Sequence, residues 1–72
     1  MKHTEVIAEV AGKVWKIAAR PGAQLVADDA ILILESMKME IPVPAPIAGK
    51  LLEVRVQEGD TVNEGDVIAV IE

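Results

Sequence analysis

The sequence predicts an all-β protein of about eight short strands, arranged as two similar halves that pack face to face. No stretch of the chain shows the apolar stripe with a period of 3.6 residues that indicates a helix. Residues 52–57 instead alternate apolar and polar side chains, as a strand with one buried face does. An internal repeat supplies the second observation, because it divides the chain into two copies of one unit.

Residues 11–35 align without a gap with residues 48–72, at an offset of 37 positions. The aligned positions include seven identities: Ala11/Ala48, Gly12/Gly49, Lys13/Lys50, Gly22/Gly59, Asp29/Asp66, Ile31/Ile68 and Glu35/Glu72. The glycines and the apolar positions stay in step over the whole alignment. We therefore interpret the two segments as copies of one supersecondary unit within a single domain that spans residues 1–72.

Each copy is predicted to contain the same elements in the same order. A glycine opens an alternating strand, a turn leads to a brief strand, and a second turn leads to the last strand. One further strand precedes each copy. In chain order the predicted strands are 4–8, 12–17, a short strand around Leu25, 30–35, 39–43, 49–54, a short strand around Val62, and 67–72.

Glycine and proline refine this prediction. The glycines are expected to mark turns that need positive φ, and Asp28, which stands where the second copy has Gly65, tolerates the same left-handed region. Pro42, Pro44 and Pro46 alternate along the chain. Alternating prolines strip the N–H donors from one edge of a strand, so this strand is expected either to pair on one side only or to peel away from the sheet.

Lys38 lies at the joint between the two copies, where the sequence predicts a tight hairpin turn. Two-residue hairpin turns favour Asn-Gly, Asp-Gly or Gly-X, because these residues tolerate positive φ. Met37 and Lys38 offer no such tolerance. A local rule that is broken at a position important for the fold often marks a functional site. The near-twofold symmetry also predicts that both termini lie at the end of the domain opposite Lys38.

Composition limits the core and the chemistry. The chain has 72 residues, of which 51% are hydrophobic, and Trp15 is its single aromatic residue. The core is therefore expected to be aliphatic, with Trp15 as partly buried packing. The absence of cysteine excludes a disulfide framework, a thiolate metal site and a cysteine nucleophile. His3 without clustered partners does not predict a metal site, and Ser36 lacks the partners of a catalytic nucleophile.

The net charge of −5 argues against nucleic acid as a partner, because phosphate binding needs clustered Lys and Arg. No apolar stretch approaches the ~20 residues of a membrane span, and the start of the sequence lacks the apolar region of a signal peptide. We expect a cytoplasmic protein that binds no membrane and is a monomer when isolated.

The segment Glu35–Glu40, with its central Met-Lys-Met, resembles the attachment motif of biotinyl domains. The segment Ala45–Leu51 resembles the sequence that usually follows this motif, and Glu58–Val67 resembles the Gly-Asp turns of the biotinyl/lipoyl family. The resemblance covers nearly the whole chain. It implies a flattened β-barrel of two four-stranded antiparallel sheets with pseudo-twofold symmetry, and it places Lys38 on an exposed hairpin turn. The gap-free repeat leaves no room for the protruding thumb of some carrier domains.

The same resemblance implies a non-catalytic carrier. A biotin protein ligase would attach biotin to Lys38, and the carrier would move carboxyl groups between a biotin carboxylase and a carboxyltransferase. The lipoyl counterpart of the motif typically has Asp before the lysine and Ala after it, so Met37 and Met39 favour biotin over lipoate. A lipoyl or dual carrier and a non-carrier β interaction module are the alternatives.

Two interpretations are open for the residues that flank Lys38. Met37 and Met39 either present adaptable apolar surface to partners or cap one end of the core. Glu35 and Glu40 either guide recognition by the ligase or are solvated strand ends. For Glu35 the second interpretation is favoured, because Glu72 occupies the matching position of the other copy.

Overall fold

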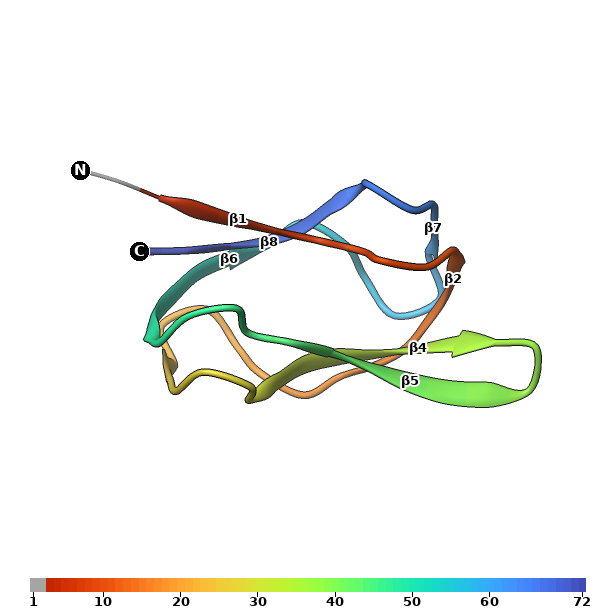
Figure 1. The fold of residues 1–72 in the computed structure, drawn as a ribbon, viewed down its shortest axis with the longest axis horizontal. Helices are drawn as coiled ribbons and strands as arrows, with labels where there is room; N and C mark the ends of the chain where they lie inside the picture. The colour runs from red at the N-terminus through yellow and green to blue at the C-terminus, as the bar shows by residue number, and fades with distance from the viewer. Residues whose placement is uncertain (1–2) are drawn as a thin grey trace.

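The computed structural model describes residues 3–72 and contains two four-stranded antiparallel sheets (Figure 1). The strand order is β1-β8-β6-β3 in one sheet and β5-β4-β2-β7 in the other. The strands are β1 (Thr4–Ile7), β2 (Gly12–Ile17), β3 (Gln24–Leu25), β4 (Ala30–Ser36), β5 (Met39–Pro44), β6 (Gly49–Val54), β7 (Thr61–Val62) and β8 (Val67–Ile71). The predicted all-β class is thereby confirmed.

Backbone hydrogen bonds obey the predicted pseudo-twofold symmetry. The Val14 amide donates to the carbonyl of Asp60 over 2.7 Å, and the Leu51 amide donates to the carbonyl of Ala23 over 2.9 Å. Adding or subtracting the 37-residue offset converts the first bond into the second. Since the donor and acceptor come from different copies, the same bonds also hold the two halves together.

The copies exchange their shortest strands. β3 belongs to the first copy and pairs with β6 of the second, whereas β7 belongs to the second copy and pairs with β2 of the first. Each sheet therefore contains strands from both copies. A β sandwich of this size needs both sheets to enclose one core, and the exchange makes neither copy complete without the other.

The core between the sheets is aliphatic, as predicted. No polar or charged residue is buried within the part of the chain that the structure describes. The buried hydrophobic residues are Val6, Ala8, Val14, Ala19, Leu25, Ile31, Leu32, Leu34, Val43, Ala45, Leu51, Val62, Ile68, Ala69, Val70 and Ile71. The largest fully buried leucine and isoleucine side chains come from β4, β6 and β8, which lie in the interior of their sheets.

Trp15 differs from the prediction, because 49% of its surface is exposed and it does not belong to the core. Trp15 points outward by simple alternation, because it follows the buried Val14 on the strand. A β-bulge comes next, since the register of β2 against β4 shifts between Val14 and Lys16. The extra residue interrupts the alternation, so Val14 is buried whereas Trp15 and Lys16 are both exposed. The β6–β8 pair shifts at the matching place of the second copy, and there the smaller Leu52 is half-buried.

The glycines fall into two groups. Gly65 has φ of 92°, and Asp28 at the matching position has φ of 75°, as predicted. Gly12 opens β2 and is needed for a different reason: a β-carbon there would lie 2.9 Å from the backbone oxygen of Glu35. Gly49 is crowded in the same way by the backbone oxygen of Glu72. The expectation of positive φ is therefore wrong for Gly12 and Gly49, where close approach of the neighbouring strand excludes a side chain.

The molecule is elongated, with extents of 36 × 18 × 17 Å. The β4–β5 hairpin lies at one end of the long axis, and the beginning of β1 and the end of β8 lie at the other (Figure 1). This arrangement agrees with the predicted separation of Lys38 from the termini. Within residues 3–72 the structure contains no helix that is long and apolar enough to span a membrane.

Candidate functional site

Lys38 occupies the tip of a two-residue turn that joins β4 to β5. Ser36 and Met39 are the last registered pair of the hairpin, and Met37 and Lys38 connect them with φ of 52° and 66°. Positive φ at both central residues is the pattern of a type I′ turn. The left-handed region costs a residue with a β-carbon roughly 1–2 kcal/mol. The turn is therefore strained, and glycine or asparagine would fit it better.

The strands below the turn hold it in this conformation. β4 and β5 are registered from Ala30 and Pro44 up to Ser36 and Met39. The side chains of Leu32 and Leu34 on β4 are completely buried. β5 is the edge strand of its sheet and pairs with β4 alone, which is the first of the two arrangements expected from its prolines. A strained turn persists where its surroundings fix it, and here paired strands anchored in the core do so.

The side chains at the tip face solvent. Lys38 is exposed, and no ion pair found within residues 3–72 involves its amine. Met37 is 93% exposed and Met39 is 62% exposed. Capping of the core is therefore wrong for Met37. Two adaptable apolar side chains on either side of an accessible amine form a surface of the kind that partner proteins bind.

Glu35 and Glu40 are brought together one residue pair below the turn, after Ser36 and Met39. They are registered partners across β4 and β5, and both are exposed. Lys13 on β2 is the registered partner of Glu35 on its other side. The three side chains form a row across the sheet. One residue pair, Ser36 and Met39, separates this row from the turn. Glu35 and Glu40 thus place negative charge on both strands that present the lysine.

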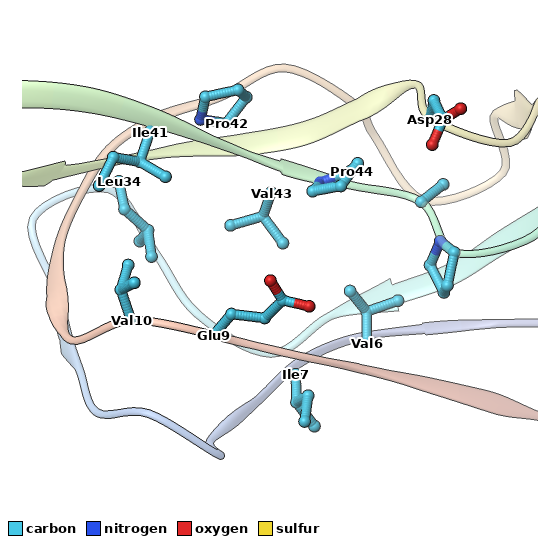
Figure 2. Close-up of a pocket in the computed structure, with 12 residues that line it drawn as sticks. Val6, Ile7, Glu9, Val10, Asp28, Leu34, Ile41, Pro42, Val43 and Pro44 are labelled. Carbon is cyan, nitrogen blue, oxygen red and sulfur yellow. The ribbon is translucent and has the colours of Figure 1, made fainter.

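A groove that the sequence did not predict lies between the edge strands β1 and β5 (Figure 2). Its volume is about 280 Å³. The lining is largely apolar and includes Val6 and Val10 on one side and Ile41 and Val43 on the other. Glu9 extends its carboxylate into the groove (Figure 2). Sequence reasoning missed Glu9, because nothing in its neighbourhood forms a motif.

The structure brings together the lysine, both methionines and both glutamates at one end of the domain. It does not add a catalytic group to them: Ser36 is half-buried within β4, and His3 lies outside the strands. Within residues 3–72, no three His, Cys, Asp or Glu side chains gather where they could hold a metal ion. The chemistry that this site offers is an accessible amine held in a fixed place.

The comparison with protein families gives one match that covers almost the whole chain. The family model described as "Biotin-requiring enzyme" matches residues 1–71. The chain is 48% identical over 60 residues to a "Biotin/lipoyl attachment protein" of Bacillus subtilis, and the match covers 83% of this chain and 82% of the relative. It is 45% identical over 67 residues to a "Biotinylated protein TB7.3 homolog" of Mycobacterium leprae, with 93% and 94% covered.

Among solved structures, the urea carboxylase of Kluyveromyces lactis contains a similar domain. The TM-score is 0.95 and the sequence identity is 35%. The match covers 100% of this chain but only 6% of the carboxylase. The similarity thus concerns one small domain of a much larger protein.

Proposed function

This chain belongs to the biotin/lipoyl attachment family, and from that premise we propose that it is a biotin carboxyl carrier with biotin attached to Lys38. The observation that carries the proposal is the position of Lys38 at the tip of the strained β4–β5 turn. An attached group needs an amine that is accessible and yet fixed in space. Lys38 meets both requirements, because it is exposed and stands on two paired strands.

Attachment is an amide bond between the lysine and the carboxyl group of biotin. The amine must lose a proton as the amide forms, and no ion pair or side-chain hydrogen bond within residues 3–72 involves Lys38. We therefore assign removal of the proton to a biotin protein ligase. The Nζ–C bond forms as the bond between the activated carbonyl carbon and its leaving group breaks, and the ligase takes the proton. This chain supplies position, and its partner supplies catalysis.

The residues at the tip support biotin over lipoate. Met37 and Met39 flank Lys38 on both sides, as in the Met-Lys-Met motif that the chain shares with biotinyl domains. The relative from Mycobacterium leprae is named as biotinylated, whereas the one from Bacillus subtilis is named for both groups. Lipoate at Lys38 is the second candidate, since the same exposed amine would serve it.

The partners that we propose are a biotin carboxylase and a carboxyltransferase. Biotin, when bound, accepts a carboxyl group in one active site and gives it up in another. The resemblance to a domain of a urea carboxylase supports this role. The elongated shape also suits it, because the lysine lies at one end of the 36 Å axis and enters an active site before the rest of the domain does.

Intact-mass analysis after co-expression tests the proposal. The chain is produced with a biotin ligase and, separately, with a lipoyl ligase. We expect one biotinyl group on the wild type and none on Lys38→Ala. Lys13→Ala and Lys50→Ala serve as matched controls, because these lysines occupy equivalent positions of the two copies on β2 and β6. Both control variants should carry one biotinyl group.

Two results would overturn parts of the proposal separately. Biotin on the Lys38→Ala variant would contradict the assignment of the lysine. A lipoyl group on the wild type, with no biotin in the parallel culture, would replace the cofactor while keeping the carrier role.

A further inference from the structure

The outer faces of the two sheets differ at one pair of equivalent positions, Ile33 on β4 and Val70 on β8. The repeat offset of 37 residues relates the two positions, and neither side chain belongs to the core between the sheets. Val70 is nevertheless only 4% exposed, whereas Ile33 remains partly exposed. One half of the molecule therefore covers this position from outside, and the other half leaves it open.

An arginine with two ion pairs covers Val70. The registered partners of Val70 are Glu5 on β1 and Glu53 on β6. Arg55 Nη1 lies 3.9 Å from Glu5 Oε2, and Arg55 Nε lies 3.0 Å from Glu53 Oε1. The side chain that joins these two carboxylates passes over Val70, because the carboxylates flank it on both sides. Its aliphatic stem shields the valine while its guanidinium stays in water.

The first half lacks this cover. At the positions equivalent to Glu5, Glu53 and Arg55 it has Pro42, Lys16 and Ala18. Pro42 and Lys16 are the registered partners of Ile33, and both are exposed. Pro42 lies on the side of β5 opposite Val43, which faces inward (Figure 2). The bulge in β2 places Trp15 beside Lys16. Trp15, Lys16, Ile33 and Pro42 together are named the outer patch.

The outer patch combines apolar surface with one unpaired cation. Tryptophan is enriched among the residues that dominate binding between proteins, and Trp15 is 49% exposed. No ion pair or side-chain hydrogen bond within residues 3–72 involves Lys16. Glu58 approaches β2, but its carboxylate accepts a hydrogen bond from the Ile17 amide over 3.2 Å. The matching surface therefore presents an apolar side chain beside a carboxylate.

A partner that takes Lys38 into its active site needs more contact area than the end of the molecule offers. The short extents of 18 and 17 Å give a cross-section of roughly 300 Å². Specific interfaces bury about 600–1,000 Å² on each partner. Such a partner must extend along the side of the hairpin. Pro42 follows Lys38 by four residues, or roughly 13 Å at about 3.3 Å per strand residue, so the outer patch lies within that footprint.

We propose that the outer patch is the surface on which the biotin protein ligase rests while Lys38 enters its active site. An apolar side chain of the ligase lies against Trp15 and Ile33, and an acidic side chain of the ligase pairs with Lys16. This inference rests on the proposed attachment of biotin to Lys38, and it adds where the enzyme that attaches biotin holds the domain.

A second copy of the chain is a poorer occupant of the outer patch. Its own patch carries the same Lys16, so a twofold contact between patches would bring like charges together. The net charge of −5 on each copy adds a general repulsion. A ligase surface with a carboxylate meets neither obstacle at Lys16.

Steady-state kinetics of biotinylation tests the inference. The unmodified chain is the varied substrate of the biotin ligase that is used for co-expression. We expect Trp15→Ala and Lys16→Glu each to raise KM about fivefold or more and to leave kcat within about twofold of the wild type. The reason is that the outer patch binds the ligase away from the reacting amine.

Two control variants match these changes on the other sheet. Ile7→Ala removes an apolar side chain of similar exposure, 48% against 49% for Trp15, and Lys50→Glu makes the same charge change on β6. Both controls should keep the KM of the wild type. Equal increases in the controls would assign the effect to lost apolar area or net charge and would contradict the inference. An unchanged KM in Trp15→Ala and Lys16→Glu would overturn it.

Nuclear magnetic resonance of the wild type gives a measurement that does not depend on the folding of a variant. The isotope-labelled chain is titrated with the ligase in the absence of ATP, so that no biotin is transferred. We expect the amide signals of Trp15, Lys16 and Ile33 to shift or broaden and that of Val70 to stay unchanged. Changes only at residues 36–40, or at no residue of the outer patch, would overturn the inference.

Two further outcomes are distinct from these. Shifts at the outer patch that grow with the concentration of the chain alone would assign the patch to a second copy and would overturn its assignment to the ligase. Absence of biotin from every protein in the mass analysis would instead contradict the proposed function, before the question of the outer patch arises.

Discussion

Glu35 and Glu40 lie directly opposite each other across the β4–β5 hairpin, so two like charges face each other one residue pair below the Met37–Lys38 turn. Directly opposed like charges destabilise a strand pair, within a range of about 0.2–1 kcal/mol for cross-strand interactions. The hairpin also contains a turn with unfavourable φ at two residues. Stability is therefore reduced twice at the end of the molecule that presents the lysine, and the buried strands must compensate.

Reversing one charge of the Glu35–Glu40 pair should stabilise the domain. Glu40→Lys replaces repulsion by attraction, and we expect the free energy of unfolding to rise by roughly 0.5–1 kcal/mol at low salt. The gain should largely disappear in 1 M NaCl, where the Debye length is about 3 Å. Urea unfolding at the two salt concentrations measures both quantities. Glu64→Lys makes the same charge change outside the hairpin, and an equal gain there would contradict the pairwise explanation.

The φ of Lys38 gives a second prediction. Lys38→Gly should be more stable than Lys38→Ala by about 1 kcal/mol, because glycine adopts the left-handed region without the strain of a β-carbon. Both variants lack the amine, so the difference between them isolates the backbone. Chemical denaturation measures it. Equal stability of the two variants would show that the turn relaxes to negative φ in the alanine variant.

The methionines beside Lys38 should be sensitive to oxidation. Hydrogen peroxide transfers one oxygen atom to a thioether and leaves as water, and exposed sulfur reacts first. Met37 is 93% exposed and Met39 is 62% exposed, so we expect Met37 to gain oxygen faster. Peptide mapping by mass spectrometry measures the two rates. Met37→Leu is the control that leaves Met39 alone on the hairpin, and faster oxidation of Met39 in the wild type would contradict the order.

The pseudo-twofold symmetry predicts matched effects in the core. Ile31 and Ile68 are equivalent positions of the repeat, and both are fully buried. Each lies where the register of its strand shifts against an edge strand. Ile→Val at either position should lower the free energy of unfolding by about 0.5–1.5 kcal/mol, with similar values for the two. Thermal or urea unfolding checks this, and a loss at one position alone would contradict equivalent packing.

Much of the fold could be predicted because the chain contains two copies of the same unit. Alternation in one copy and the matching glycines in the other locate the same strands, so weak signals reinforce each other. The strain of the turn could also be predicted: a two-residue hairpin turn needs positive φ, Met37 and Lys38 are unsuited to it, and the structure has positive φ at both. Asp28 at the position of Gly65 could be interpreted in the same way.

The features that could not be predicted depend on how separate segments meet. Lys16 is exposed beside Trp15 because a bulge shifts the register of β2, and a register shift leaves no mark in the local pattern. Gly12 is needed because a carbonyl of β4 approaches it, which is a contact between distant residues. Glu9 lines the groove because edge strands of the two sheets lie side by side there, which is again an arrangement of distant segments.

One consequence of the symmetry concerns the ends of the chain. Thr4 and Ile71 are registered partners, and their counterparts in the repeat are Ile41 and Leu34, which are registered partners in the lysine hairpin. The β1–β8 ladder therefore repeats the β5–β4 ladder with its turn left open. A flexible tether fixed to either end would leave the domain at the pole opposite Lys38. The domain would swing as a rigid lever about that tether, with the lysine describing the widest arc and the other pole almost none.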